Sequence, residues 1–173
     1  MKHTRTTPAL AALAIAALAL VGCAPTAPVA DAPVATQAES VTITDAWVKA
    51  VESGMTAAFG LVENSGDAEV TIVAASSAAS PMIELHETVD DGTGTMTMRQ
   101  KDGGFVIAPG ESLELMPGGN HIMFMGVTEP IVAGDEITIT LEFADGSTLE
   151  FTAPAKDFTG ANENYDDSME MND

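Results

Sequence analysis

Residues 136–152 read EITITLEFADGSTLEFT, and this stretch decides the fold class. Apolar and polar side chains alternate along its first half, which is typical of a strand with one buried face. The Asp145-Gly146 pair that follows favours a tight turn between antiparallel strands. The stretch therefore predicts a β-hairpin.

The same kind of pattern continues backward from the hairpin to Val41. Short β-prone runs alternate with turn segments rich in Gly, Asn and Asp, and no run has the spacing of an amphipathic helix. Such regular spacing predicts an all-β protein, a sandwich or a barrel. The strands expected before and within the hairpin are 41–49, 56–63, 69–75, 82–88, 96–101, 105–107, 112–116, 121–127, 136–143 and 147–152.

Length and charge exclude several classes of protein. The chain has 173 residues, which is enough for one domain. Only six Lys and Arg face 26 Asp and Glu, a formal net charge of -20, so a nucleic-acid partner is not expected. The sequence has no nucleophile elbow, no phosphate-binding glycine loop and no CxxC, and we expect no enzyme activity.

The N-terminal residues indicate export and lipid anchoring. Two basic residues precede the apolar run 9–21, a layout typical of a secretory signal. Residues 20–23, Leu-Val-Gly-Cys, resemble the bacterial lipobox, which implies that Cys23 is lipidated. We therefore expect a signal peptide at 1–22 and a protein that is extracytoplasmic and held to the cell membrane by lipid.

Composition divides the remainder of the chain into three parts. Residues 23–40 are rich in Ala and Pro and are expected to form a flexible tether. The predicted β-sandwich occupies 41–155, and 156–173 is expected to be a disordered acidic tail. The tail contains Met169 and Met171, which leaves open whether it captures a metal ion loosely or is only a solvated end.

Both histidines outside the signal peptide lie beside methionines. If 121–127 is a strand, His121, Met123 and Met125 share one face. His86 and Met98 each lie six residues from Gly92, so a hairpin centred there would place them opposite or nearly opposite one another. Two imidazoles and two thioethers could then converge on one metal ion, with Met96 as an alternative to Met98 and Met125 as an auxiliary residue.

The nature of the donors indicates the metal. Thioethers are soft, neutral ligands that suit Cu(I), and imidazole is acceptable beside them. A site without thiolate does not match a blue-copper electron-transfer centre. We therefore expect copper to be carried in an accessible apolar pocket at a rim of the fold, with an affinity that falls as acid protonates the imidazoles.

Several motifs together resemble the periplasmic copper chaperone family written PCu(A)C. They are residues 84–87 (ELHE), 96–99 (MTMR) and 117–126 (PGGNHIMFMG), with further likeness at 45–50 and 54–59. The family signature is His, then Met, then His-x-Met, with spacers of about ten and twenty-one residues. In this chain the corresponding spacers between His86, Met98 and His121 are eleven and twenty-two.

This resemblance covers residues 41–153 and carries further expectations. It implies a cupredoxin-like, immunoglobulin-like antiparallel β-sandwich that binds one Cu(I) through His86, Met98, His121 and Met123. It also implies delivery to a cuproprotein, either a subunit of cytochrome c oxidase with its dinuclear copper centre or another copper chaperone. Two alternatives stay open: a lipoprotein that sequesters copper without delivering it, and an adhesion or scaffold lipoprotein that binds no metal.

Overall fold

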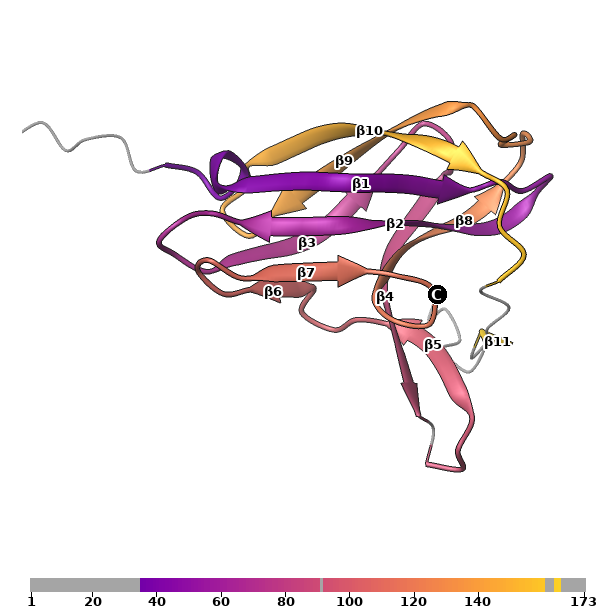
Figure 1. Ribbon diagram of the computed structural model, residues 1–173, viewed down its shortest axis with the longest axis horizontal. Coiled ribbons are helices and arrows are strands. Elements are labelled where there is room, and N and C mark those ends of the chain that lie inside the picture. The colour runs from indigo at the N-terminus through magenta and orange to yellow at the C-terminus, as the bar shows by residue number, and fades with distance from the viewer. Residues whose placement is uncertain (1–34, 91, 161–163, 166–173) are drawn as a thin grey trace, which may run out of the picture. The chain divides into compact units, whose positions relative to one another are not determined.

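Strands make up almost all of the regular structure in the described part of this chain. A computed structural model describes residues 35–90, 92–160 and 164–165 (Figure 1). Its elements are η1 (Ala38–Ser40), β1 (Val41–Lys49), β2 (Gly54–Asn64), β3 (Val70–Ser76), β4 (Met82–Asp90), β5 (Met96–Gln100), β6 (Phe105–Ile107), β7 (Ser112–Leu115), β8 (His121–Val127), β9 (Glu136–Phe143), β10 (Thr148–Lys156) and β11 (Asn164–Tyr165).

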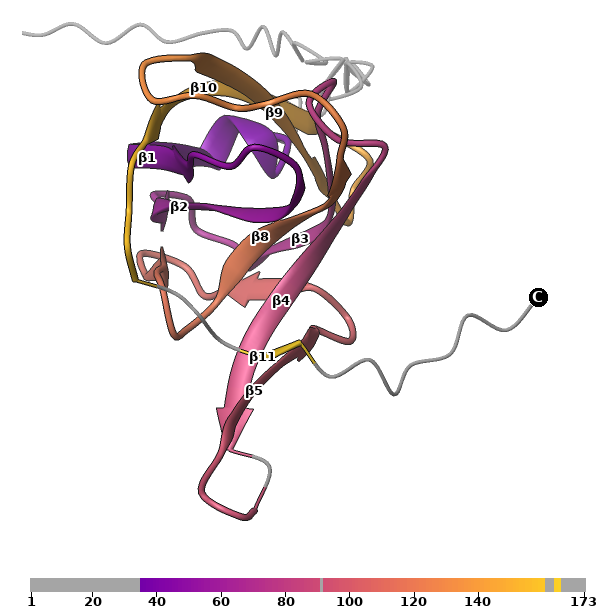
Figure 2. The same cartoon turned by 90° about the vertical axis from the view of Figure 1, so that its right-hand side faces the viewer.

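The strands form one continuous sheet that doubles over itself. Their order is β11-β5-β4-β8-β2-β1-β10-β9-β3-β6, and β7 pairs separately with β2. Most neighbours are antiparallel, but β1 pairs with β10, and β11 with β5, in parallel. The β10-β9-β3-β6 part packs on the β1-β2-β8-β4 part through a shared apolar core (Figures 1 and 2). The predicted all-β sandwich is confirmed.

The core fills the space between the two layers. Its members come from both, and those with less than 2% exposure include Phe124 on β8, Val62 on β2, and Ile139, Leu141 and Phe143 on β9. Ile139, Leu141 and Phe143 occupy alternate positions of β9, which is why the period-two pattern of 136–152 predicted the hairpin correctly. The described part of the chain contains no helix with the length and hydrophobicity needed to cross a membrane.

The chain packs on the domain beyond both ends expected from the sequence. In the segment assigned to the tether, the Gln37 backbone N–H donates to Asp145, and its side-chain oxygen accepts from the Thr71 N–H. At the other end, β10 continues to Lys156 and β11 pairs with β5, so parts of the expected acidic tail belong to the fold. Residues 1–34, including the signal peptide, Cys23 and most of the tether, lie outside the described residues.

The β4–β5 hairpin extends away from the two packed layers (Figures 1 and 2). On one of its faces, Glu87 accepts hydrogen bonds from Arg99 Nη2 at 2.8 Å and from Lys101 Nζ at 2.7 Å. The Lys101 hydrogen bond, followed by that of Arg99, lowers the pKa of Glu87 from its ordinary value of 4.5. The two cations thus favour the ionised carboxylate in the folded state.

Replacing Glu87 with glutamine is expected to destabilise the fold slightly at neutral pH. A lowered folded-state pKa stabilises the fold above the unfolded-state pKa, and this stabilisation is lost as pH falls through the folded-state pKa. Because Arg99 is half exposed, we expect less than about 1 kcal/mol. Denaturant unfolding of both proteins should show a gap near neutral pH that narrows in acid; a gap that widens in acid would contradict this account.

Candidate metal centre

Three adjacent strands present the four predicted ligands on one face of the sheet. Strand β4 lies between β5 and β8, and both pairings run without a register shift. Ile83, Leu85, Ile122 and Phe124 face the core, so the residues that alternate with them face the other way. His86, Met98, His121 and Met123 all belong to this opposite face, which we call the ligand face.

The two imidazoles lie directly across from each other. His86 on β4 pairs with His121 on β8, and the ring centroids are 5.5 Å apart with the ring planes at 60°. His86 is 0% exposed and His121 is 2% exposed. One ion with metal–nitrogen bonds of about 2 Å can fit between rings at this separation.

Each imidazole is held through one of its two nitrogens. Nε2 of His86 lies 2.7 Å from a carboxylate oxygen of Glu84, and Nδ1 of His121 lies 3.0 Å from the backbone carbonyl oxygen of Gly119. Because both oxygens only accept, each of these nitrogens must donate. In the neutral rings the lone pairs therefore lie on His86 Nδ1 and His121 Nε2, which are both buried. Carboxylate and carbonyl groups orient metal-binding histidines in the same way.

Two buried methionines flank the histidines. Met123 lies two residues beyond His121 on β8 and is 5% exposed, and Met98 on β5 is 7% exposed. Neither belongs to the main apolar core. Phe59 on β2, also buried outside that core, contacts the His121 ring at 6.3 Å between centroids. The ligand face thus has its own buried cluster, with two imidazoles and two thioethers within it.

The β4–β5 register differs from the hairpin expected from the sequence. His86 pairs with Gln100, and Met98 pairs with Thr88 instead. The turn is therefore centred on Thr93, one residue beyond Gly92. This change of centre shifts the cross-strand partner of each residue by two positions, so His86 lies opposite Gln100 and not opposite Met98. Met98 is consequently a diagonal neighbour of His86, still on the same face and within reach of a long side chain.

The auxiliary methionines also lie on the ligand face but are less enclosed. Met96 pairs with Asp90 near the tip of the hairpin and is 47% exposed, which separates it clearly from buried Met98. Met125 is half-buried and pairs with Met82 at the other end of β4. Burial and position thus favour Met98 over Met96 as the companion of His86.

The site is more enclosed than the accessible pocket that we expected. All four predicted ligands are buried in this conformation. A row of aromatic rings, which we call the aromatic cover, adjoins one of them: Phe59 contacts the His121 ring, Trp47 on β1 lies 4.6 Å from Phe59, and Phe158 after β10 contacts Trp47 at 5.2 Å. Metal exchange therefore requires either a local opening or an exposed neighbouring ligand.

The last residue of β10 and residues that follow it contact the β1 strand beside this cover. Lys49 Nζ donates to the carbonyl oxygen of Gly160 at 2.8 Å, and Lys156 lies 5.8 Å from the Trp47 ring centre. Lys156, Phe158 and Gly160, from the segment that the sequence assigned to the tail, thus contact Trp47 or Lys49 of β1. Met169 and Met171 lie outside the described residues.

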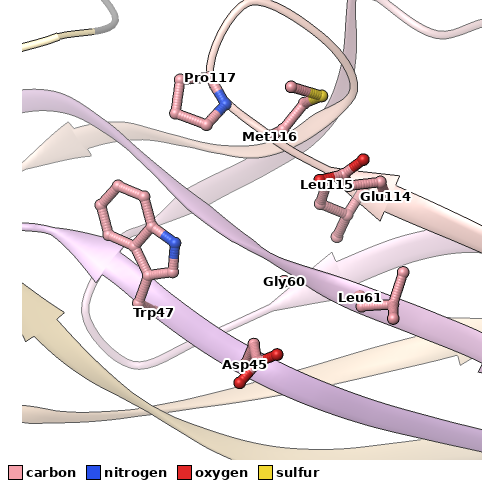
Figure 3. A pocket seen from close by; sticks show the side chains of 8 residues that line it. All are labelled: Asp45, Trp47, Gly60, Leu61, Glu114, Leu115, Met116 and Pro117. Atoms are coloured by element: carbon pink, nitrogen blue, oxygen red, sulfur yellow. The ribbon is translucent and has the colours of Figure 1, made fainter.

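A pocket of about 380 Å³ lies beside the aromatic cover (Figure 3). Trp47 and Asp45 of β1 line one part of it, and Met116 and Pro117 of the segment after β7 line another. None of the four predicted ligands lines this pocket. The segment that borders it continues to Gly119, whose carbonyl orients His121, so the pocket adjoins the support of the site and not the site itself.

Sequence reasoning did not identify Glu84 as part of the site. Its carboxylate touches His86, and its cross-strand partner is Met123, so it lies between two predicted ligands. Its position in the sequence could have identified it, because Glu84 lies two residues before His86 and this spacing places both on one face of a strand. A carboxylate behind a histidine ligand fixes the ring and raises its basicity.

Replacing Glu84 with glutamine is expected to weaken Cu(I) binding by about ten- to hundredfold, the usual effect of losing such a partner. Glu87→Gln is the matched control, because Glu87 lies three residues further on the same strand and faces Arg99 on the opposite side. Competition against a chromophoric Cu(I) chelator under reductant measures both affinities. Equal affinities in the two variants would remove Glu84 from the site.

Comparisons with known proteins agree with this architecture. A family model described as "LpqE-like: Putative lipoprotein LpqE-like" matches residues 41–155. A relative in Leifsonia xyli subsp. xyli (strain CTCB07), named "Putative lipoprotein Lxx21020", is 51% identical over 129 residues, which cover 75% of this chain and 77% of the relative. The names of both the family and the relative thus describe lipoproteins.

Solved structures of similar fold carry copper in their names. A copper-bound PCuAC domain from PmoF2 has a TM-score of 0.57 at 17% identity and covers 69% of this chain and 94% of that domain. The CuI-DR1885 solution structure from Deinococcus radiodurans has a TM-score of 0.54 at 26% identity, covering 71% of this chain and 84% of that one. These likenesses confirm the predicted cupredoxin-like fold.

Proposed function

The chain belongs to the LpqE-like lipoprotein family, and on that premise we propose that it is an extracytoplasmic metallochaperone that binds Cu(I) and delivers it to a cuproprotein. One observation carries the proposal. His86 and His121 lie directly opposite each other, oriented by Glu84 and Gly119, in a buried cluster that also contains two thioethers.

The donor set accounts for the choice of ion. Two neutral imidazoles and two neutral thioethers provide soft ligation without a thiolate, which favours Cu(I) over harder divalent cations. Glu84 adds one negative charge beside His86 and offsets the charge of a bound monovalent ion. The name of the similar protein CuI-DR1885 supports the same assignment.

The four proposed ligands have distinct positions. His86 and His121 supply nitrogens from facing strands, Met123 supplies sulfur from the strand of His121, and Met98 supplies sulfur from β5. Because the ligands come from three strands, the folded sheet brings them together before copper arrives. Ligands that are already positioned bind with a smaller loss of conformational entropy.

A lipid anchor on Cys23 would hold this site on the outer side of the cell membrane. We propose that Cys23 is lipidated after removal of residues 1–22 and that the segment after it keeps the domain near the membrane surface. The lipoprotein names of the family and of the Leifsonia relative support this location. A cuproprotein on the same membrane, such as the dinuclear copper subunit of cytochrome c oxidase, would then be within reach as the acceptor.

Sequestration without delivery is the second candidate, and the burial of the ligands favours it. An ion held by four buried side chains exchanges slowly unless a partner opens the site or an exposed ligand receives the ion. A carrier and a store can have the same binding site. They differ in whether copper leaves to a partner.

Deletion of the gene separates the two candidates. Delivery predicts a loss of cytochrome oxidase activity that appears at low copper and is restored by added copper. Complementation with the native chain should restore the activity, and complementation with a Met98→Leu, Met123→Leu chain should not. Sensitivity only at high copper, with normal oxidase at low copper, would contradict delivery and favour sequestration.

A further inference from the structure

The ligand face carries a stripe of soft donors that is longer than the proposed site. Along β4 and its neighbours the cross-strand pairs are Met82 with Met125, Glu84 with Met123, His86 with His121, Thr88 with Met98 and Asp90 with Met96. Two of these pairs, Met82 with Met125 and Asp90 with Met96, contain none of the four proposed ligands and do not include Glu84. The middle of the stripe is buried, and both ends reach solvent, because Met82 is 44% exposed and Met96 is 47% exposed.

Two thioethers face each other at one end of the stripe. Met82 and Met125 are direct partners on antiparallel strands, so their β-carbons lie about 4.5–5.5 Å apart. At the other end, Met96 pairs with the Asp90 carboxylate, and no thioether of the described residues is its direct cross-strand partner. The Met82–Met125 end is therefore the one that can offer two sulfur ligands to a single ion.

The backbone around this methionine pair is fixed. The hydroxyl group of buried Ser80 lies 2.9 Å from the carbonyl oxygen of Met82 and 2.5 Å from that of Met125. The pairing of β8 with β2 has a β-bulge between Phe124 and Val127 that contains Met125 and Gly126, and Gly126 has a positive φ of 71° there. Bulges of this kind fix the direction of neighbouring side chains.

Distance along the strand connects the pair to the buried ligands. Met125 and Met123 lie two residues apart on the same face, a separation of about 7 Å. Met82 stands in the same relation to Glu84, which contacts His86. An ion at the exposed pair would therefore need to move only about 7 Å along the ligand face to reach Met123.

We propose that Met82 and Met125 form a second, exposed Cu(I) site that receives copper from solution and passes it to or from the buried ligands. The proposal rests on the proposed function for its use, because it supplies the access that the buried site lacks. The transfer is a ligand exchange: a sulfur–copper bond to the exposed pair breaks as one to Met123 forms, and copper stays monovalent throughout. Two neutral thioethers bind more weakly than the four-ligand set, so copper fills the buried site first.

Methyl NMR of the protein with ¹³C-labelled methionine tests this site directly. The probe is Ag(I), a soft monovalent ion that stays in one oxidation state, in a Cys23→Ala background that removes the single thiol. The first equivalent should shift the methyl signals of Met98 and Met123. Further Ag(I) should shift those of Met82 and Met125 together along one saturating curve.

Met116 provides the matched control, because it is 44% exposed, like Met82, and lies after β7, outside the described pairs of the stripe. Its signal should stay in place over the range in which Met82 and Met125 saturate. If Met82 and Met125 move no more than this control, the exposed site does not exist. If Met98 and Met123 fail to respond to the first equivalent, the proposed function fails, whatever the exposed pair does.

Transfer kinetics give the second measurement. A Met82→Leu, Met125→Leu protein should release Cu(I) to a chelator several-fold more slowly, while its equilibrium affinity for the first ion is unchanged. The conservative change preserves side-chain volume, so the fold should be retained. Equal release rates in this variant and in a Met116→Leu protein would overturn the role in transfer.

Discussion

Replacing Met98 and Met123 together with leucine is expected to lower the Cu(I) affinity by more than about a hundredfold, because the loss of two ligands exceeds the loss of a partner behind one ligand. Leucine fills a similar volume, so the change removes both sulfurs and leaves the apolar packing of the cluster. The two histidines would remain as a pair of nitrogen donors with no soft ligand beside them.

The measurement is competition with a Cu(I) chelator under reductant in the Cys23→Ala background. The Met55→Leu, Met116→Leu protein is the control, since it loses the same number of thioethers from exposed positions. Its affinity should match that of the parent. An affinity that is unchanged in the Met98→Leu, Met123→Leu protein would show that the buried thioethers do not bind the ion.

Replacing Phe124 with alanine is expected to cost about 3–5 kcal/mol of stability, the usual range for a large buried aromatic residue. Phe124 is 0% exposed and packs in the core between the layers, on the side of β8 that faces away from the ligands. The cavity that alanine leaves is lined by residues of both layers, which limits how far the core can collapse into it.

Met123→Leu is the matched control on the adjacent residue of the same strand, and it should cost less than about 1.5 kcal/mol. Denaturant unfolding gives both values. The two faces of β8 should thus separate cleanly: one change lowers stability and the other lowers copper affinity. A loss below about 1 kcal/mol for Phe124→Ala would contradict the placement of this residue in the core.

The strands were predictable because local chemistry specifies them. Turn residues bound each run, and alternation within 136–143 gives the buried face directly. Strand 121–127 lacks such alternation, because residues 121–124 are buried on both faces. The parallel strand β11 and the packing of Phe158 were missed, because neither depends on a pattern within its own segment. Both depend on surfaces contributed by strands far away in the sequence.

The register of the β4–β5 hairpin shows why symmetry around a glycine was an insufficient guide. The Asp90 carboxylate accepts hydrogen bonds from the backbone N–H groups of Gly92 and Gly94 at 2.7 and 3.2 Å. These bonds are formed within the turn, while Asp90 remains paired with Met96. The turn therefore centres on Thr93, and Met98 lies diagonal to His86 instead of opposite it.

The direct opposition of His86 and His121 could not be read from the sequence. Period two places each residue on a face, but it does not say which strands are neighbours or in which register they pair. The burial of the site was unpredictable for the same reason, because its cover comes from Trp47 and Phe59 on β1 and β2. The soft-donor composition predicted which residues bind the ion, and only the fold shows that they lie on one face of the sheet.

Copper-edge X-ray absorption on the Cys23→Ala protein loaded with one equivalent of Cu(I) shows which atoms bind the ion. Ligation by His86, Met98, His121 and Met123 predicts a monovalent edge with both sulfur and imidazole nitrogen bound to copper, and loss of the sulfur scattering in the Met98→Leu, Met123→Leu protein. Nitrogen and oxygen ligands alone, or sulfur scattering that survives the double substitution, would contradict this ligation.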